Sequence, residues 1–248
     1  MTAEPYDSIR RTARLAGGLY LSLLPLGGFS FVYVPSMLFV RGDAAATSRN
    51  IVASELLFRS GIVSHLISQI IVPFLALAMY RLLKQVNKEH AAAMVVMALL
   101  CVPISFLAEV NSLAALRLLS GAGEGAFTET QLQTQAMLFL DMRQSGVLLA
   151  QMFWGLWLLF VGSLVFRSGF LPRWLGIAVV IGAAGYLVDS GMHLMVPGRA
   201  TISQFTALGE LMLPVWLLVK GVSVERWPGP PHGDGAHSRV GREPRNSS

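Results

Sequence analysis

The chain has 248 residues, of which 54% are hydrophobic and only 13% are charged. Soluble domains carry about 25% charged residues, so this composition excludes an ordinary soluble domain and is typical of a membrane protein. The net charge of +5 does not indicate nucleic-acid binding, because the basic residues lie between apolar runs instead of forming one basic stripe. The single cysteine, Cys101, excludes an internal disulfide.

The N-terminal segment combines a basic start with a long apolar run, a pattern that also occurs in signal peptides. The run continues to Val40, well beyond the roughly 7 to 15 residues of a signal-peptide core, and no small-x-small cleavage site ends it. The sequence therefore predicts a retained first membrane helix.

Six stretches have the roughly 20 mostly apolar residues that a membrane-spanning helix needs. They are residues 15–40, 62–83, 91–110, 146–167, 172–195 and 201–222. Two further stretches, 47–60 and 128–143, are too short and too polar to cross, and predict amphipathic helices. The predicted fold is all-α: a polytopic, six-helix transmembrane bundle with short amphipathic helices on the outer side.

The bundle divides the chain into three parts. Residues 1–14 form an N-terminal segment, residues 15–222 form the membrane domain, and residues 223–248 form a tail rich in proline, glycine, serine and arginine. The tail has too few apolar residues to fold, so it is predicted to be disordered.

Lysine and arginine counts predict the orientation of the bundle. Thirteen of the 19 basic residues lie on the side of the N-terminus, the second and fourth connections and the C-terminus, and six lie on the opposite side. Both termini are therefore predicted to be cytoplasmic. Residues 41–62 then lie outside.

Ionisable residues within membrane spans are costly, so each one marks a candidate functional site. Helix rise and the predicted orientation place most of these residues in the outer half of the bundle, with Glu210 near the midplane. The sequence therefore predicts an outward-facing polar cavity. Its candidate residues are the ionisable His65, Glu109, Asp189, His193 and Glu210, together with the nearby polar residue Asn111.

The first connection, residues 41–62, is predicted to cover this cavity as an outer lid. Gly42 permits a tight turn, and Thr47 or Ser48 can cap a helix that runs through Arg59. Glu55 and Arg59 are one turn apart and can form an ion pair. The candidate lid residues are Asp43, Asn50, Glu55 and Arg59.

Several segments carry a resemblance to a known family: RTARLAGGLYL, GDAAATSRNIVASELLFRSGI, YRLLKQVNK, FWGLWLLFVGSLVFRSGFLPRWLG and GELMLPVWLLVKGV. Together, from about Arg11 to Val222, they resemble the bacterial membrane family called domain of unknown function 4386. The resemblance implies a six-helix integral membrane protein, typically of bacterial inner membranes, with no established activity. It therefore transfers no catalytic or ligand residues to this chain.

Three classes of function fit these observations. The first is binding or translocation of a small ligand or proton through the outward-facing cavity. The second is an intramembrane enzyme that uses His65, Asp189, His193 and a carboxylate, although no catalytic motif appears. The third is a non-catalytic accessory subunit of an envelope complex.

The expected partners follow from the same reading. They are the lipid bilayer and a small-molecule or lipid-like ligand, with no nucleic acid and no metal or other cofactor. Six helices are few for a solute carrier, which leaves room for a homodimer.

Overall fold

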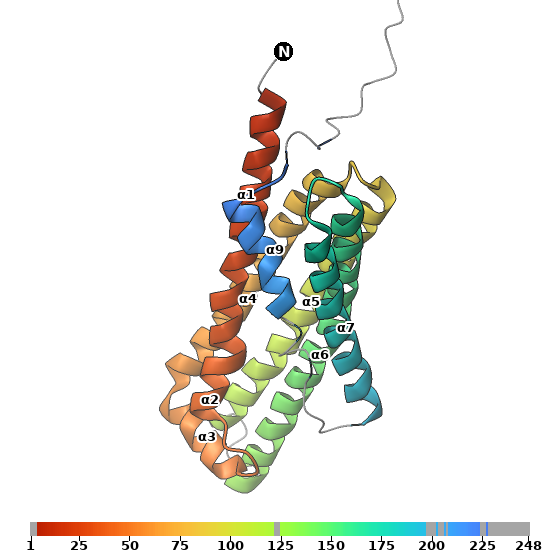
Figure 1. Cartoon of the computed structure of the whole chain (residues 1–248). Coiled ribbons are helices and arrows are strands. Elements are labelled where there is room, and N and C mark those ends of the chain that lie inside the picture. The colour runs from red at the N-terminus through yellow and green to blue at the C-terminus, as the bar shows by residue number, and fades with distance from the viewer. Residues whose placement is uncertain are drawn as a thin grey trace, which may run out of the picture.

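The computed structural model describes residues 4–121, 125–196, 202, 206, 208–223 and 227. Within that part the regular elements are helices and there is no strand (Figure 1), which confirms the all-α prediction. The elements are α1 (Glu4–Gly28), a π-helical turn η1 (Phe29–Tyr33), α2 (Val34–Leu38), α3 (Ala44–Ala53), α4 (Glu55–Leu83), α5 (Lys88–Leu119), α6 (Glu129–Arg167), α7 (Arg173–Met195) and α9 (Leu208–Val219).

Five helical stretches are long and apolar enough to cross a membrane. They are Ser8–Leu38, which combines most of α1 with η1 and α2, and the whole of α4, α5, α6 and α7. The predicted sixth span, residues 201–222, falls partly outside the described residues, and its described part is the 12-residue apolar helix α9. The predicted tail, 223–248, lies outside the described residues except for Ser223 and Trp227.

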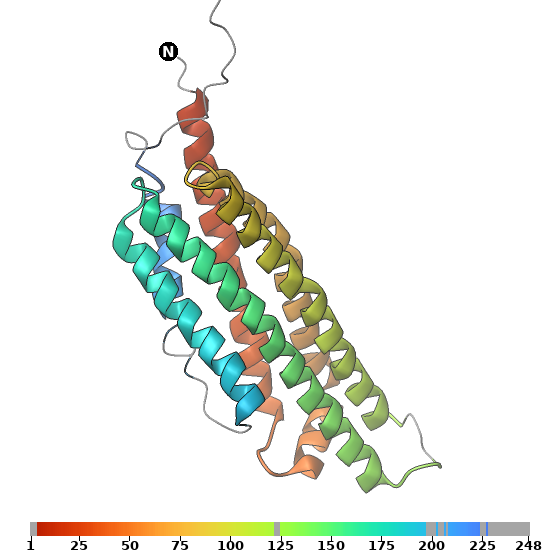
Figure 2. The same cartoon turned by 90° about the vertical axis from the view of Figure 1, so that its right-hand side faces the viewer.

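The long helices form an elongated antiparallel bundle (Figures 1 and 2). Helix α6 packs along both α5 and α7, and α1 packs against α4 and α9. The start of α1 and the end of α9 lie at the same end of the bundle, and α2 and α3 lie at the opposite end (Figure 1).

Glycine allows α6 and α7 to approach closely. A Cβ atom at Gly162 would lie 2.8 Å from the carbonyl oxygen of Gly176, and one at Gly176 would lie 2.7 Å from the carbonyl oxygen of Gly162. Membrane helices associate through small residues of this kind, because lipid tails provide no hydrophobic force that drives helices together.

Helix α6 corrects one prediction. The sequence separates a short helix at 128–143 from a span at 146–167, whereas the structure has one 39-residue helix, Glu129–Arg167. Thr128 and Gln131 form a capping box that starts this helix. The polar residues near 141–144 do not interrupt it because Arg143, the cation among them, is paired with a carboxylate on α5.

The first connection also differs from its prediction. Gly42 adopts a positive φ of 77°, as a tight turn requires, but the cap of α3 is Asp43 and not Thr47 or Ser48. The Asp43 side chain accepts a hydrogen bond from the backbone N–H of Ala46 at 2.7 Å. The predicted single helix breaks at Ser54 (φ −126°, ψ 43°), and α4 begins directly after it.

Candidate functional site

Four polar side chains meet between α4, α5 and α6, and we call them the ionic cluster: His65, Glu109, Ser112 and Arg143. His65 Nδ1 lies 2.6 Å from Oε1 of Glu109, and Arg143 donates to the same oxygen from Nη2 at 2.9 Å and from Nε at 3.2 Å. The Ser112 hydroxyl donates to Oε2 at 2.6 Å. Both carboxylate oxygens therefore have charged or polar partners.

The cluster is buried. His65 and Glu109 are 2% and 1% exposed, and the Arg143 side chain is 11% exposed. His65 lies ten residues after the start of α4, and Glu109 lies ten residues before the end of α5, which is roughly 15 Å from the helix ends. Because both helices are longer than the sequence predicts, the pair lies further from the helix ends than expected.

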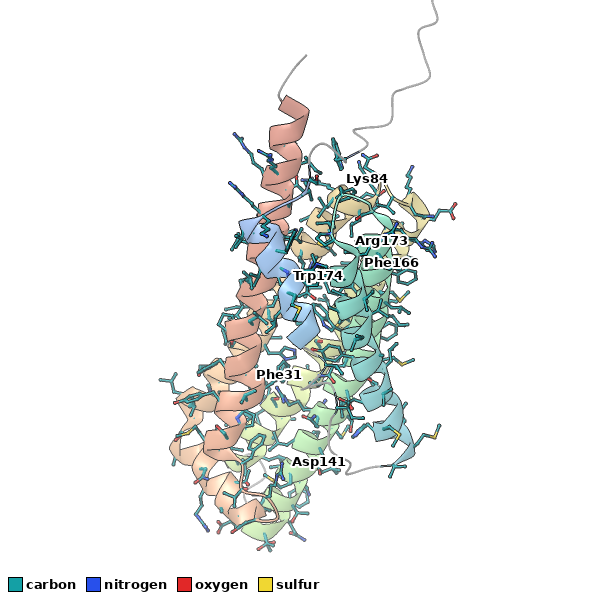
Figure 3. The ribbon with its side chains drawn as sticks, in the orientation of Figure 1. Phe31, Lys84, Asp141, Phe166, Arg173 and Trp174 are labelled. Atoms are coloured by element: carbon teal, nitrogen blue, oxygen red, sulfur yellow. The ribbon has the colours of Figure 1, made fainter. Side chains whose placement is uncertain are left out.

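Local packing fixes the geometry of the cluster. A Cβ atom at Gly146 would lie 2.9 Å from Cβ of Ala108, so α6 and α5 are closely packed beside Glu109. Phe31 covers the cluster: its ring lies 4.7 Å from the His65 ring and 5.6 Å from Cζ of Arg143. Figure 3 shows Phe31 in the half of the bundle that contains α2 and α3.

A small cavity of about 20 Å³ adjoins the cluster, and Ser30, Ser112 and Arg143 are among its lining residues. This volume is about that of one water molecule. The hydroxyl oxygen of Ser30 is buried and has no hydrogen-bond partner among the described residues. Ser30 and Phe31 both belong to the π-helical turn η1, a type of helix that frequently occurs at functional sites.

Glu210 lies in a second, separate group, the Glu210 cluster, formed with Tyr20, Trp154 and Tyr186. Tyr20 donates its hydroxyl to Oε1 at 2.5 Å, Trp154 donates Nε1–H to Oε1 at 3.2 Å, and Tyr186 donates to Oε2 at 3.1 Å. Glu210 is 6% exposed. Three neutral donors from three helices thus hold one buried carboxyl group.

The remaining candidate residues lie in other places. Asp189 accepts a hydrogen bond from the backbone N–H of Ile202 at 2.7 Å, and His193 Nε2 lies 3.4 Å from the hydroxyl oxygen of Ser145. Asn111 donates to the carbonyl oxygen of Leu107 in its own helix at 3.2 Å. The structure therefore brings His65 and Glu109 together but gives Asn111, Asp189, His193 and Glu210 other partners.

The lid residues make contacts that hold the first connection in place. Asp43 caps α3, and Asn50 donates to the carbonyl oxygen of Leu38 at 3.2 Å. Glu55 and Arg59 form the predicted ion pair at 2.6 Å. Ile51, fully buried, packs in the hydrophobic cluster that joins α3 to the end of α5 and the start of α6.

The sequence pattern did not indicate Arg143 or the aromatic partners of Glu210 as site residues. Arg143 lies before the predicted span at 146–167, in the segment 128–143 that is too short and too polar to cross a membrane. Residues 128–167 contain no proline, which is compatible with one continuous helix that includes Arg143. No sequence signal distinguishes Tyr20, Trp154 and Tyr186 from the other aromatic residues of the spans.

The enzyme hypothesis requires His65, Asp189 and His193 to act together, but each of them has a different partner in the structure. Among the described residues, no three His, Cys, Asp or Glu side chains lie close enough to hold one metal ion together. His65 contacts Glu109, whereas His193 contacts Ser145, so the two histidines belong to different surroundings.

Within the described residues the regular elements are helices, and five helical stretches are apolar and long enough to cross a membrane. The buried carboxylate of Glu109 contacts His65 and Arg143 between these helices. These features define a polytopic helical membrane protein. The chain belongs to the family described as domain of unknown function (DUF4386), whose model matches residues 15–221. The family prediction made from the sequence is thereby confirmed.

A relative from Archaeoglobus fulgidus, itself described as an uncharacterized protein, is 38% identical over 74 residues. This match covers 29% of the present chain and 44% of the relative, so it spans less than half of that protein's length. No solved structure matches the chain.

Proposed function

We propose that this protein binds or translocates a proton or a small polar ligand at the ionic cluster. The proton or ligand would enter from the end of the bundle that carries α2 and α3. The observation that supports it is the contact between His65 and Glu109, a carboxylate that also pairs with Arg143. Buried ionisable residues in membrane helices are costly and mark ion or proton paths.

The proton form of the proposal follows from the charges. With Arg143 and Glu109 both ionised, their charges cancel, and His65 can add one positive charge by taking up a proton. Histidine is the side chain whose charge changes most readily near neutral pH. The small cavity beside Ser30 and Arg143 supplies room for the water that would deliver the proton.

The proposed arrangement in the membrane has six spans, of which residues 201–222 are the sixth and α9 is its described part, with both termini in the cytoplasm. It is supported by the common end of the bundle at which α1 starts and α9 ends (Figure 1). The excess of basic residues at that end supports it as well, and Figure 3 shows Lys84 and Arg173 there, with Asp141 towards the other end. The inner membrane is the proposed location.

Cysteine labelling tests this orientation, because Cys101 is the only native cysteine. In a Cys101→Ser background, Arg49→Cys on α3 should react with a membrane-impermeant maleimide in intact cells. Lys84→Cys, in the connection between α4 and α5, should react only after the cells are permeabilised. The reverse pattern would show that the orientation is inverted.

Proton flux tests the function. The purified chain is reconstituted in liposomes that contain a pH-sensitive dye, and a pH gradient is imposed. Wild-type protein should collapse the gradient faster than empty liposomes, and His65→Gln should not, although the Glu109–Arg143 pair remains. Glu89→Gln, at an exposed residue in the first turn of α5, is the control and should behave as wild type. Equal rates for wild type and His65→Gln would contradict a proton path through this cluster.

A further inference from the structure

A surface groove of about 730 Å³ lies where the start of α4 meets the end of α5. Arg59 and Arg117 line it together with Val110, Leu113 and Ala114. Both arginines are exposed, and they come from two neighbouring antiparallel helices. The groove thus combines two cations with an apolar wall.

We propose that this groove binds an anionic phospholipid, with its phosphate between Arg59 and Arg117 and its acyl chains along α5. The arginine guanidinium group matches a phosphate through parallel N–H donors. Basic pockets between membrane helices on the cytoplasmic or matrix side bind anionic lipid head groups, and the same charge complementarity applies to this groove at the end that carries α2 and α3. Val110 and Leu113, which are 58% and 43% exposed, offer the apolar surface for the chains.

The position of the groove fits the level of a lipid head group. Arg59 lies one turn after the start of α4, and Arg117 lies two residues before the end of α5. Helix α5 has 32 residues and is therefore about 48 Å long, which exceeds the roughly 30 Å of a bilayer core. Its last turn consequently reaches the polar region of the bilayer, where lipid phosphates lie.

The Glu55 carboxylate competes with a lipid phosphate for Arg59. Glu55 accepts a hydrogen bond from Nε of Arg59 at 2.6 Å, which uses one of the five N–H donors of the guanidinium group. The others remain for a phosphate, but the Glu55 charge opposes it. Removal of this carboxylate should therefore strengthen lipid binding.

The site is distinct from the ionic cluster. Val110 follows Glu109 in the sequence, but Val110 is 58% exposed whereas Glu109 is 1% exposed. Val110 therefore faces the surface of the bundle and Glu109 faces its interior. Lipid binding here does not depend on the proposed proton path, and either proposal can fail without the other.

Native mass spectrometry of the detergent-purified full chain tests the proposal, with phosphatidylglycerol and phosphatidylcholine of identical acyl chains as probes. Wild-type protein should retain phosphatidylglycerol preferentially. Arg59→Gln and Arg117→Gln should each weaken this retention by about fivefold, as expected for one basic residue near an anionic head group. Glu55→Gln should strengthen it.

Two further variants control for charge and folding. Arg49→Gln removes an exposed cation from α3 at the same end of the bundle and should leave retention unchanged. Ala114→Phe fills the groove while both arginines remain and should weaken retention. Each variant is first shown to be monodisperse by size exclusion. Equal retention of the two lipids by wild type, or an equal loss in Arg49→Gln and Arg117→Gln, would overturn the proposal.

Discussion

His65 Nδ1 and Oε1 of Glu109 lie 2.6 Å apart in the interior of the bundle, and Arg143 donates to the same oxygen. The imidazole of His65 and the guanidinium group of Arg143 thus contact the same carboxylate oxygen. Any change in the charge of His65 acts directly on the Glu109–Arg143 pair, because little solvent is present to screen it. The stability and the proposed function of the protein therefore depend on the same few atoms.

Glu109→Gln should lower the free energy of unfolding by about 3 to 5 kcal/mol, because it leaves the buried Arg143 charge without its partner. Glu55→Gln is the matched control. The side chains of Glu55 and its partner Arg59 are 42% and 52% exposed, so the free energy of unfolding should fall by at most about 1 kcal/mol. Thermal unfolding of the detergent-purified variants measures the difference.

A double variant shows whether the loss arises from the unpaired charge. Glu109→Gln combined with Arg143→Gln should recover part of the stability, since no uncompensated charge remains buried. A different result is a loss of unfolding free energy in the double variant that equals the sum of the losses in Glu109→Gln and Arg143→Gln. That result would show that the two residues do not interact and would contradict the ionic cluster.

Tyr186→Phe should destabilise the protein by about 1 to 3 kcal/mol, because it takes a hydrogen-bond donor away from a buried carboxyl oxygen of Glu210. Tyr186 donates to Oε2 of Glu210 at 3.1 Å. Tyr33→Phe makes the same chemical change at a residue that is 49% exposed and should be close to neutral. Melting temperatures of the two variants that are equal within error would argue against the Glu210 cluster.

Gly17→Ala and Gly18→Ala should have opposite effects, although the residues are adjacent in α1. A Cβ atom at Gly17 would lie 2.8 Å from backbone atoms of Pro214 and Leu218, whereas one at Gly18 would meet no atom within 4 Å. Gly17→Ala should therefore separate α9 from α1 and destabilise the protein. Gly18→Ala should stabilise it by up to about 1 kcal/mol through helix propensity. Thermal unfolding distinguishes the signs, and two neutral results would place α9 elsewhere.

Asp43→Ala should loosen α3 at a cost of about 1 kcal/mol, because it removes the side-chain oxygen that caps the helix. Asp43→Asn keeps an oxygen at the cap and should retain most of the stability. Hydrogen exchange of the backbone amides in residues 44–53 is the measurement. Faster exchange in both variants would show that the charge of Asp43, and not the cap, holds this helix.

Hydropathy identified the long helices well, but it located their ends poorly. Both ends of α7 and the C-terminal end of α4 agree with the prediction, whereas α4 starts seven residues earlier than predicted and residues 128–143 do not form a separate helix. Hydropathy is a sum over neighbours in sequence, and it counts Arg143 as a break. In the folded protein Glu109 compensates that charge from another helix, so the helix continues.

The sequence determined the class of protein, the apolar spans, and the rarity of ionisable residues within them, because each of these properties is set by the composition of a single segment. The tertiary structure decided which of those residues meet. His65 and Glu109 come together because α4 and α5 pack in one register, and Arg143 joins them because Gly146 lets α6 approach Ala108. Helix rotation and register depend on such contacts between segments, and no single segment contains that information.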